Sequence, residues 1–194
     1  MKTLATPLAG LVLVELDAFA DARGRFLETF HRARYRELGI ATELDFVQDN
    51  FSSSVHGVLR GLHYQLVHPQ GKLVHITRGE VFDVAADLRV GSPTFGRWFG
   101  VTLSAENRRQ LWIPPGFAHG FLVTGAEDDC IYKVTSAYAP GDEHAIRWDD
   151  PALAIEWPQA TGGGAPILSG KDAAAPTLAE ARARGALPTW GGAA

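Results

Sequence analysis

Short runs of strand-forming residues recur along almost the whole chain, separated by clusters of Gly, Pro, Asp and Asn, and this pattern restricts the fold more than any other feature. Residues 76–81 are typical of a hairpin turn between two such runs. Many short strands with few helices predict an antiparallel barrel or sandwich, and the pattern alone leaves jelly-roll and immunoglobulin-like topologies both open. We place the strands near residues 11–16, 25–30, 45–51, 56–66, 71–78, 80–88, 97–103, 110–113, 119–124, 129–137 and 145–148.

Two short segments have helical character. Residues 32–38 precede Gly39, which is a suitable C-terminal cap, and residues 178–184 end before Gly185. The 194 residues are enough for one domain with a sizeable core. The Gly- and Ala-rich residues 185–194 are expected to be poorly ordered.

The composition argues against several classes of function. The net charge is −4 and no run of Lys or Arg stands out, which disfavours nucleic acid as a partner but allows anionic ligands at local basic side chains. No apolar stretch approaches the ~20 residues of a membrane-spanning helix, so no membrane partner is expected. The single cysteine, Cys130, excludes an internal disulfide and a multi-cysteine metal site, and a cytoplasmic location is the simplest interpretation.

The segment from Val58 to Gln65 is the strongest indication of chemistry. It has His63 on a strand-like run, and histidine suits proton transfer because its unperturbed pKa lies near neutrality. Arg60 precedes His63 by three residues, so an ideal strand would point the two side chains to opposite faces. A bend at Gly61 would allow them to converge on one site.

Further motifs follow in a fixed order: DARGRF (21–26), FVQDN (46–50), LRGLH (59–63), QGK (70–72), GEVFDV (79–84), SPTFG (92–96), LSAEN (103–107), WIPPGFAHG (112–120), YKVT (132–135) and LSGKD (168–172). Together they resemble the dTDP-4-dehydrorhamnose 3,5-epimerases, which are enzymes of deoxysugar biosynthesis. The resemblance implies an all-β, cupin-like jelly-roll barrel with short flanking helices. It also implies a single epimerase domain over residues 1–176, followed at 177–194 by a short helix and a flexible tail.

The resemblance also implies a reaction and the residues that perform it. Epimerisation beside a ketone needs a base on one face of the sugar, an acid on the other, and a group that stabilises the enolate oxygen. His63 matches the family's base, and Asp172 matches the carboxylate that orients it. Tyr132 matches the acid on the opposite face, and Lys72 matches the residue near the C4 oxygen. No cofactor and no metal are implied.

Asp83 and His75 are interpreted from their surroundings. Asp83 is polar within an apolar run, so we expect it to support the site by contacting Lys72 or His63. His75 stands where arginine is frequent in relatives, and a changed environment for Lys72 is the expected consequence.

The remaining matches concern the substrate, which would be a dTDP-4-keto-6-deoxy sugar. Arginine suits its diphosphate because the planar guanidinium meets phosphate oxygens in a bidentate way. Tyr138 matches a residue that stacks on thymine, and the region of Arg23 matches a segment that reaches a neighbouring subunit, which implies a homodimer with composite sites. The implied substrate-binding residues are Arg23, Phe26, Glu28, Gln48, Asn50, Arg60, Lys72, His119, Tyr138, Glu143 and Lys171.

Three other functions compete with the double epimerisation. A single-centre epimerase, acting at C3 or C5 alone, would use the same base and acid. A metal-dependent cupin would need a pair of histidines one residue apart, and His56, His63, His68, His75 and His119 contain no such pair. A non-catalytic sugar-nucleotide-binding protein would have no use for both His63 and Tyr132.

Overall fold

The computed structural model describes residues 1–159 and 164–191. The strands are β1 (Lys2–Leu4), β2 (Val12–Glu15), β3 (Phe19–Asp21), β4 (Gly24–Phe26), β5 (Gln48–Val55), β6 (Leu59–Gln65), β7 (Lys72–Asp87), β8 (Trp98–Ser104), β9 (Arg109–Ile113), β10 (Phe117–Val134) and β11 (Glu143–Ala145). The helices are α1 (Arg32–Glu37), α2 (Gly170–Ala173), α3 (Leu178–Ala183) and a 3₁₀ turn, η1 (Pro140–Asp142). No described helix is long and apolar enough to cross a membrane.

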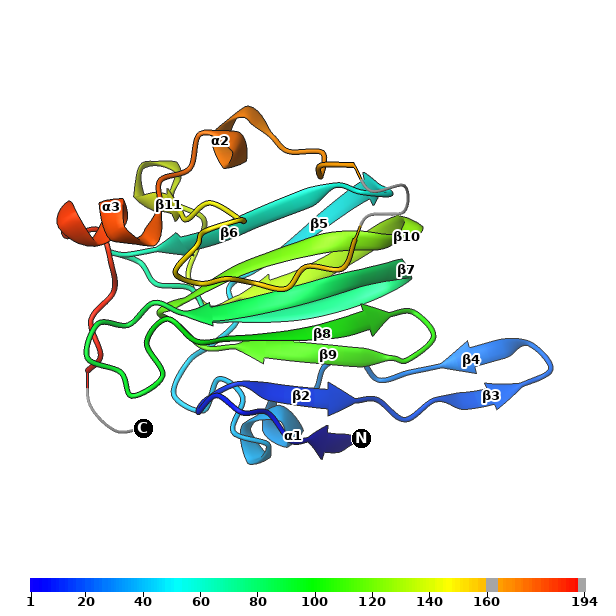
Figure 1. The fold of residues 1–194 in the computed structure, drawn as a ribbon. Coiled ribbons are helices and arrows are strands. Elements are labelled where there is room, and N and C mark those ends of the chain that lie inside the picture. Colours follow the sequence, from blue (N-terminus) through cyan, green and yellow to red (C-terminus); the bar gives the residue numbers. More distant parts are fainter. Residues whose placement is uncertain (160–163, 192–194) are drawn as a thin grey trace.

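The long central strands β7 and β10 pair with each other in antiparallel fashion and pass through two layers of strands (Figure 1). In the first layer, the beginning of β7 pairs with β9 and the end of β10 pairs with β5. In the second layer, the end of β7 pairs with β8 and the beginning of β10 pairs with β6, which in turn pairs with β11. This arrangement confirms the predicted all-β jelly roll with short flanking helices.

The predicted hairpin at residues 76–81 is wrong, because β7 continues through it without a turn. Gly79 has φ +76°, and a Cβ there would lie 1.7 Å from the carbonyl oxygen of Glu127. The β7–β10 register shifts between Val123 and Asp128, beside Gly79. Gly79 therefore marks the bulge at which the two strands bend from one layer into the other. For the same reason, residues 119–124 and 129–137 belong to one strand, β10, rather than two.

The main core fills the space between the two layers. The first layer contributes Leu13, Val74, Ile76 and Leu111, and the second contributes Val81, Leu103, Phe121 and Val123. Two smaller clusters cover the outer faces. Tyr35 and Ile40, at α1, pack on the first layer, and Leu178 and Ala181, on α3, pack on the second.

The predicted helices are present, and the chain after them is more ordered than expected. α1 ends before Gly39, which has φ +81°, and α3 ends before Gly185, which has φ +66°. Beyond α3, Thr189 bridges to Val90 and the Arg89 guanidinium lies 4.3 Å from the centre of the Trp190 ring. The segment 185–191 is thus packed on the barrel, while residues 192–194 of the expected flexible tail lie outside the described residues. The division of the chain at residue 176 stays a prediction.

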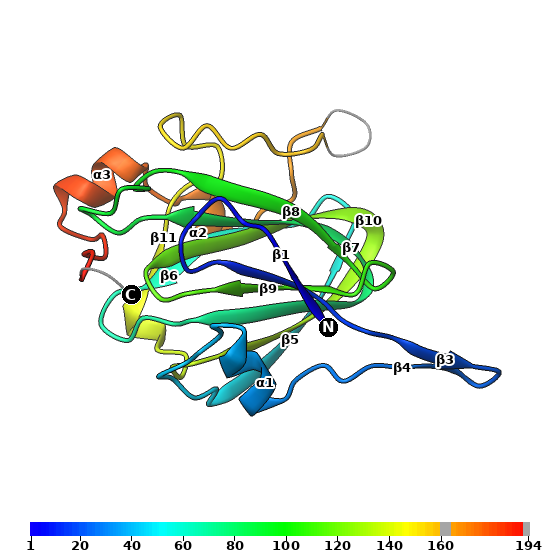
Figure 2. The same cartoon turned by 90° about the horizontal axis from the view of Figure 1, so that it is seen from below.

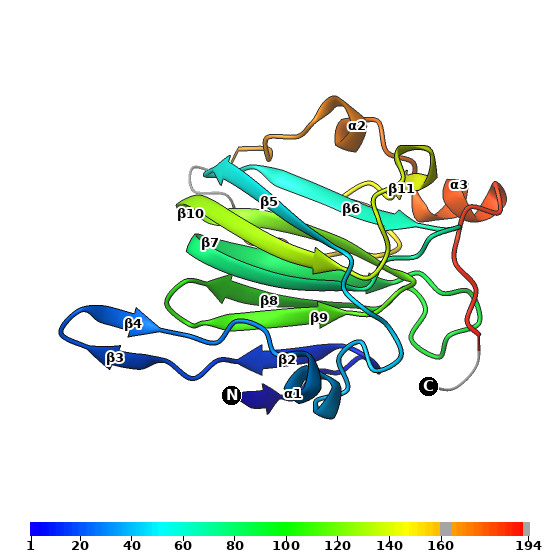
Figure 3. The same ribbon diagram turned by 180° about the vertical axis from the view of Figure 1, so that it is seen from behind.

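β3 and β4 form a separate two-stranded sheet that projects from the barrel (Figures 2 and 3). Phe19 and Phe26 stand opposite each other on this hairpin, and they are 67% and 69% exposed. Exposing large aromatic side chains to water is energetically unfavourable, so the hairpin is suited to contact another surface.

Candidate active site

Arg60 and His63 lie on the same side of β6 because a bulge interrupts the strand. His119 pairs with His63 and Phe121 pairs with Arg60, so three steps along β6 match two steps along β10. Gly61 has φ +118°, and a Cβ there would lie 2.6 Å from the Cα of Gly120. Only glycine fits this close approach, and the bend expected at Gly61 is confirmed.

His63 is hydrogen-bonded to Asp172, with 2.5 Å between its Nε2 and Oδ1 of the carboxylate. The His63 ring is about one third exposed, whereas Asp172 is buried. The other oxygen of Asp172 accepts the Ser169 hydroxyl at 2.9 Å, and Ser169 also caps the short helix α2 that carries Asp172. Burial would raise the pKa of Asp172, but the bond and charge of His63, together with the bonds from Ser169 and the Gly61 amide, hold that pKa below its usual value. An ionised carboxylate therefore faces the imidazole.

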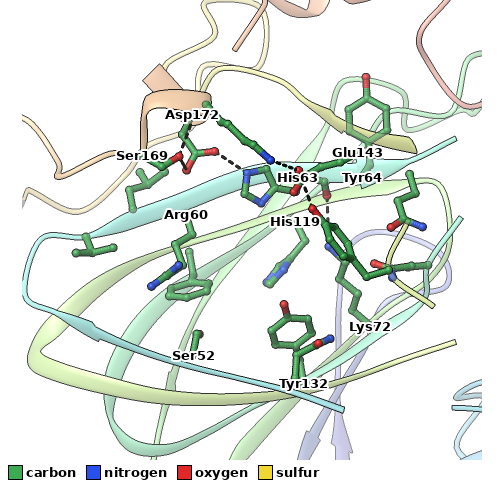
Figure 4. Close-up of a pocket in the computed structure, with 18 of the residues that line it drawn as sticks. Ser52, Arg60, His63, Tyr64, Lys72, His119, Tyr132, Glu143, Ser169 and Asp172 are labelled. Atoms are coloured by element: carbon green, nitrogen blue, oxygen red, sulfur yellow. Dashed lines mark hydrogen bonds and ion pairs between the residues drawn. The ribbon is translucent and has the colours of Figure 1, made fainter. Parts of the chain in front are cut away.

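Tyr132 lies across the cavity from His63 (Figure 4). It belongs to the inward face of β10, where it pairs with Asn50 of β5 and Val74 of β7. Burial raises the pKa of the Tyr132 phenol, so it carries its proton at neutral pH. It is placed to donate from the wall opposite to the histidine.

Lys72, Asp83 and His119 form a buried polar group between these two walls. The ammonium of Lys72 lies 3.5 Å from the carbonyl oxygen of His63. Asp83 is bonded to His119, with 2.9 Å between Oδ2 and Nε2, so its hydrogen-bond partner is neither of the two residues expected from the sequence. The β7–β10 register explains this, because Asp83 stands opposite Phe121, two residues beyond His119, and diagonal neighbours share a face of the sheet.

The far end of the cavity carries a chain of polar contacts. Lys171 donates to Glu143 at 2.8 Å, and the hydroxyl of Tyr138 donates to the same carboxylate oxygen at 3.1 Å. The bond from Lys171 holds the pKa of Glu143 below its usual value. The Gln48 amide donates to Asn50 at 2.7 Å, and its oxygen accepts the backbone N–H of Tyr138 at 3.0 Å. These contacts leave the Tyr138 ring 47% exposed and free to stack on a planar ligand.

One cavity of about 590 Å³ joins these groups between β5, β6, β10 and the segment 167–172, except Asp83, which does not line it. Sequence reasoning missed Ser169, although a serine three residues before Asp172 is the spacing of a helix N-cap. It also missed Ser52, Gln65 and Gln70, although Gln65 ends the segment around His63 and Gln70 begins the QGK motif. The predicted residues that line the cavity are Gln48, Asn50, Arg60, His63, Lys72, His119, Tyr132, Tyr138, Glu143, Lys171 and Asp172.

Four residues singled out in the sequence lie elsewhere. Arg23 is on the β3–β4 hairpin and pairs with Asp21 at 2.6 Å, while Glu28 pairs with Arg34 at 2.7 Å. Arg23, Phe26 and Glu28 do not line the cavity of this chain. His75 does not adjoin Lys72, since side chains three positions apart on a strand point to opposite faces.

Among the described residues, no group of three or more His, Cys, Asp or Glu side chains is arranged to hold a metal ion.

Known proteins are similar to this chain in sequence and in structure over nearly its whole length. The family model described as dTDP-4-dehydrorhamnose 3,5-epimerase matches residues 5–180. A protein of that name from Neisseria gonorrhoeae is 52% identical over 93% of this chain, which spans 54% of that longer protein. Another from Pseudomonas aeruginosa is 50% identical over 93% of this chain and 98% of its own length. The crystal structure of dTDP-6-deoxy-D-glucose-3,5-epimerase from Legionella pneumophila, in complex with dTDP-4-keto-L-rhamnose, is 52% identical and superposes with a TM-score of 0.92, covering 98% of this chain and 99% of that one.

Proposed function

The chain belongs to the dTDP-4-dehydrorhamnose 3,5-epimerase family, and from this premise we propose how its own residues convert dTDP-4-dehydro-6-deoxy-D-glucose to dTDP-4-dehydro-L-rhamnose. The observation that carries the proposal is the His63–Asp172 pair on one wall of the cavity, with Tyr132 on the wall opposite. Inversion beside a ketone needs a proton removed from one face and another delivered to the other.

His63 is the base. Because the ionised Asp172 accepts the Nε2–H bond, Nδ1 of a neutral His63 keeps its lone pair for the substrate proton. When Nδ1 takes that proton from C3 or C5, the imidazolium is stabilised by the carboxylate 2.5 Å away. The electron pair of the broken C–H bond moves onto the C4 oxygen as an enolate.

Lys72 faces the enolate oxygen, and Tyr132 returns a proton to the opposite face of the ring. An ammonium in a largely water-excluded site stabilises developing negative charge more strongly than it would in water. Tyr138 stacks on the thymine ring, and Arg60 binds the diphosphate. The contacts of Glu143, Lys171, Gln48 and Asn50 hold the nucleotide end of the cavity in shape.

We also propose that two copies of the chain form a dimer with composite sites. Arg23 and Phe26 lie on a hairpin that projects from the barrel, so they serve a cavity only if it belongs to another subunit. The outer face of β5 and β10 also carries exposed apolar side chains, beside the Asp49–Lys133 ion pair. Phe51, which is 64% exposed, stands opposite Ile131 on that face, beside the exposed Val47 and Val55. A symmetric dimer would cover these side chains.

The dimer is tested by mixing two inactive variants, Arg23→Ala and His63→Ala. If the sites are composite, half of the mixed dimers are hybrids and each hybrid has one intact site, so about a quarter of wild-type activity returns. A mixture that stays inactive, although light scattering shows that subunits exchange, would disprove composite sites.

A cytoplasmic location is part of this proposal. It is supported by Cys130, which is a buried free thiol of the kind that reducing compartments preserve.

Turnover in D₂O, followed by NMR at C3 and C5, tests the reaction. Deuterium at both carbons with an L-rhamno product is expected, and His63→Ala should abolish both exchanges while its circular dichroism stays unchanged. His68→Ala is the matched control, because His68 is an exposed histidine outside the cavity. Deuterium at one carbon would instead indicate a single-centre epimerase, and exchange by His63→Ala would remove His63 as the base.

A further inference from the structure

Asp83 is a fully buried carboxylate beside the cavity, and only one of its two oxygens has a hydrogen-bond partner among the described residues. Its side chain is 0% exposed, and Oδ2 accepts the bond from His119 at 2.9 Å. Its Oδ1 is buried and has no hydrogen-bond partner among the described residues. Such an arrangement is costly unless a nearby positive charge compensates for it.

Lys72 is a buried cation that lines the cavity beside His119, the hydrogen-bond partner of Asp83, and the negative charge of Asp83 acts on it. Lys72 is 9% exposed, and its ammonium has the carbonyl oxygen of His63 as a neighbour at 3.5 Å. Burial lowers the pKa of Lys72 to about 8, and the negative charges of Asp83 and then Glu143 oppose that fall. Without these charges, burial would lower the pKa of Lys72 further.

We propose that Asp83 is a positioning residue that keeps Lys72 in the ammonium form and fixes the His119 ring beside it, so that the C4 oxygen of the substrate meets a cation. This inference rests on the function proposed above. Asp83 touches no reacting atom in it. It acts through Lys72 by charge and through His119 by a hydrogen bond.

The proposal has a definite consequence for the pH dependence of kcat. Activity requires a protonated Lys72, which sets the basic limb. Burial lowers the pKa of Lys72, and the charge of Asp83 raises it. When that charge is removed, the pKa of Lys72 falls and the basic limb moves to lower pH. The titratable groups that share the cavity with Lys72 are Arg60, His63 and Tyr64 on β6, His119 and Tyr132 on β10, Glu143 on β11, and Tyr138, Lys171 and Asp172 outside those strands.

The experiment compares Asp83→Asn, Asp83→Glu and Asp87→Asn with the wild type, measuring kcat and KM from about pH 5.5 to 9.5. Asp87 is the matched control, because it is an equally buried carboxylate on β7 whose partners are Arg89, Ser92 and Thr94, all outside the cavity. We expect Asp83→Asn to move the basic limb down by about one pH unit or more, which lowers kcat at pH 8 by about fivefold or more and lowers it less near pH 6. KM should change little, and Asp83→Glu should restore much of the wild-type profile.

A uniform loss of kcat at every pH in Asp83→Asn, or an equal shift in Asp87→Asn, would overturn the inference. If Asp83→Asn does not fold, Asp83→Ser replaces it in the same comparison, since the smaller side chain leaves room for water. Deuterium exchange by the wild type distinguishes a failure of the proposed function from a failure of the role of Asp83. If the wild type exchanges no proton, the proposed function fails. If it exchanges normally but the variant profile does not move, only the role of Asp83 fails.

Discussion

His63 and Asp172 are 109 residues apart in the sequence, and their side chains meet at 2.5 Å in the cavity. Asp172→Asn keeps the size of the side chain but removes the charge that fixes the histidine tautomer and stabilises the imidazolium. We expect kcat to fall by about 10²–10⁴-fold with little change in nucleotide affinity. Steady-state kinetics with isothermal titration of dTDP measures both effects. Asp149→Asn, an exposed carboxylate paired with Arg147, is the control. Wild-type kcat in Asp172→Asn would contradict the pairing.

Ser169 donates a hydrogen bond to the oxygen of Asp172 that does not contact His63. Ser169→Ala removes both the hydroxyl that binds Asp172 and the N-cap of α2, so we expect a loss of about 1 kcal/mol of unfolding free energy. The freed carboxylate should also lower kcat by about three- to tenfold, which corresponds to one ordinary hydrogen bond. Chemical denaturation and kinetics measure the two effects, and Ser169→Thr should recover most of both. A change in stability with no change in kcat would limit Ser169 to a structural role.

Tyr132→Phe separates proton removal from proton return. The base is untouched, so deuterium should still enter the substrate from the His63 side, while inversion falls sharply, most clearly at C5. NMR in D₂O reads exchange and configuration in one sample. Tyr64→Phe is a suitable control, because the Tyr64 hydroxyl donates to the carbonyl oxygen of Ala186, away from the reacting groups. Unchanged product formation by Tyr132→Phe would refute its assignment as the acid.

Asp128 gives a prediction on stability rather than activity. Both of its carboxylate oxygens are buried, and burial raises its pKa to about 6 from 3.8, although Ser54 and Arg60 act in the opposite direction. A carboxyl whose folded pKa lies above its unfolded pKa destabilises the fold above pH 6, and this penalty vanishes as the pH falls below 4. Asp128→Asn should therefore raise the unfolding free energy by about 1–3 kcal/mol at pH 8, with the gain shrinking toward pH 4.

The control for Asp128 is Asp87, where substitution should have the opposite effect. Burial raises the pKa of Asp87 too, but bonds from Arg89, Ser92 and Thr94 outweigh it and hold that pKa below its usual value. Asp87→Asn should accordingly destabilise the protein at neutral pH. Urea denaturation at several pH values checks both variants. An Asp128→Asn protein that is less stable than the wild type at pH 8 would contradict the argument.

The sequence determined the strand-forming segments, the caps at Gly39 and Gly185, and the residue types of the site, because these depend on local propensity and on short motifs. Only the tertiary structure decided how the segments join and which side chains meet. The sequence around Gly79 is typical of a hairpin turn, but in the structure the strand only bends there. A residue with positive φ can reverse the chain or bend it, and the neighbouring strand β10 decides which. Asp83 meets His119, 36 residues away, because of the register between β7 and β10, and Asp172 reaches His63 because the segment 167–172 folds back across β6. Such contacts arise from packing between distant segments, and no local pattern encodes that packing.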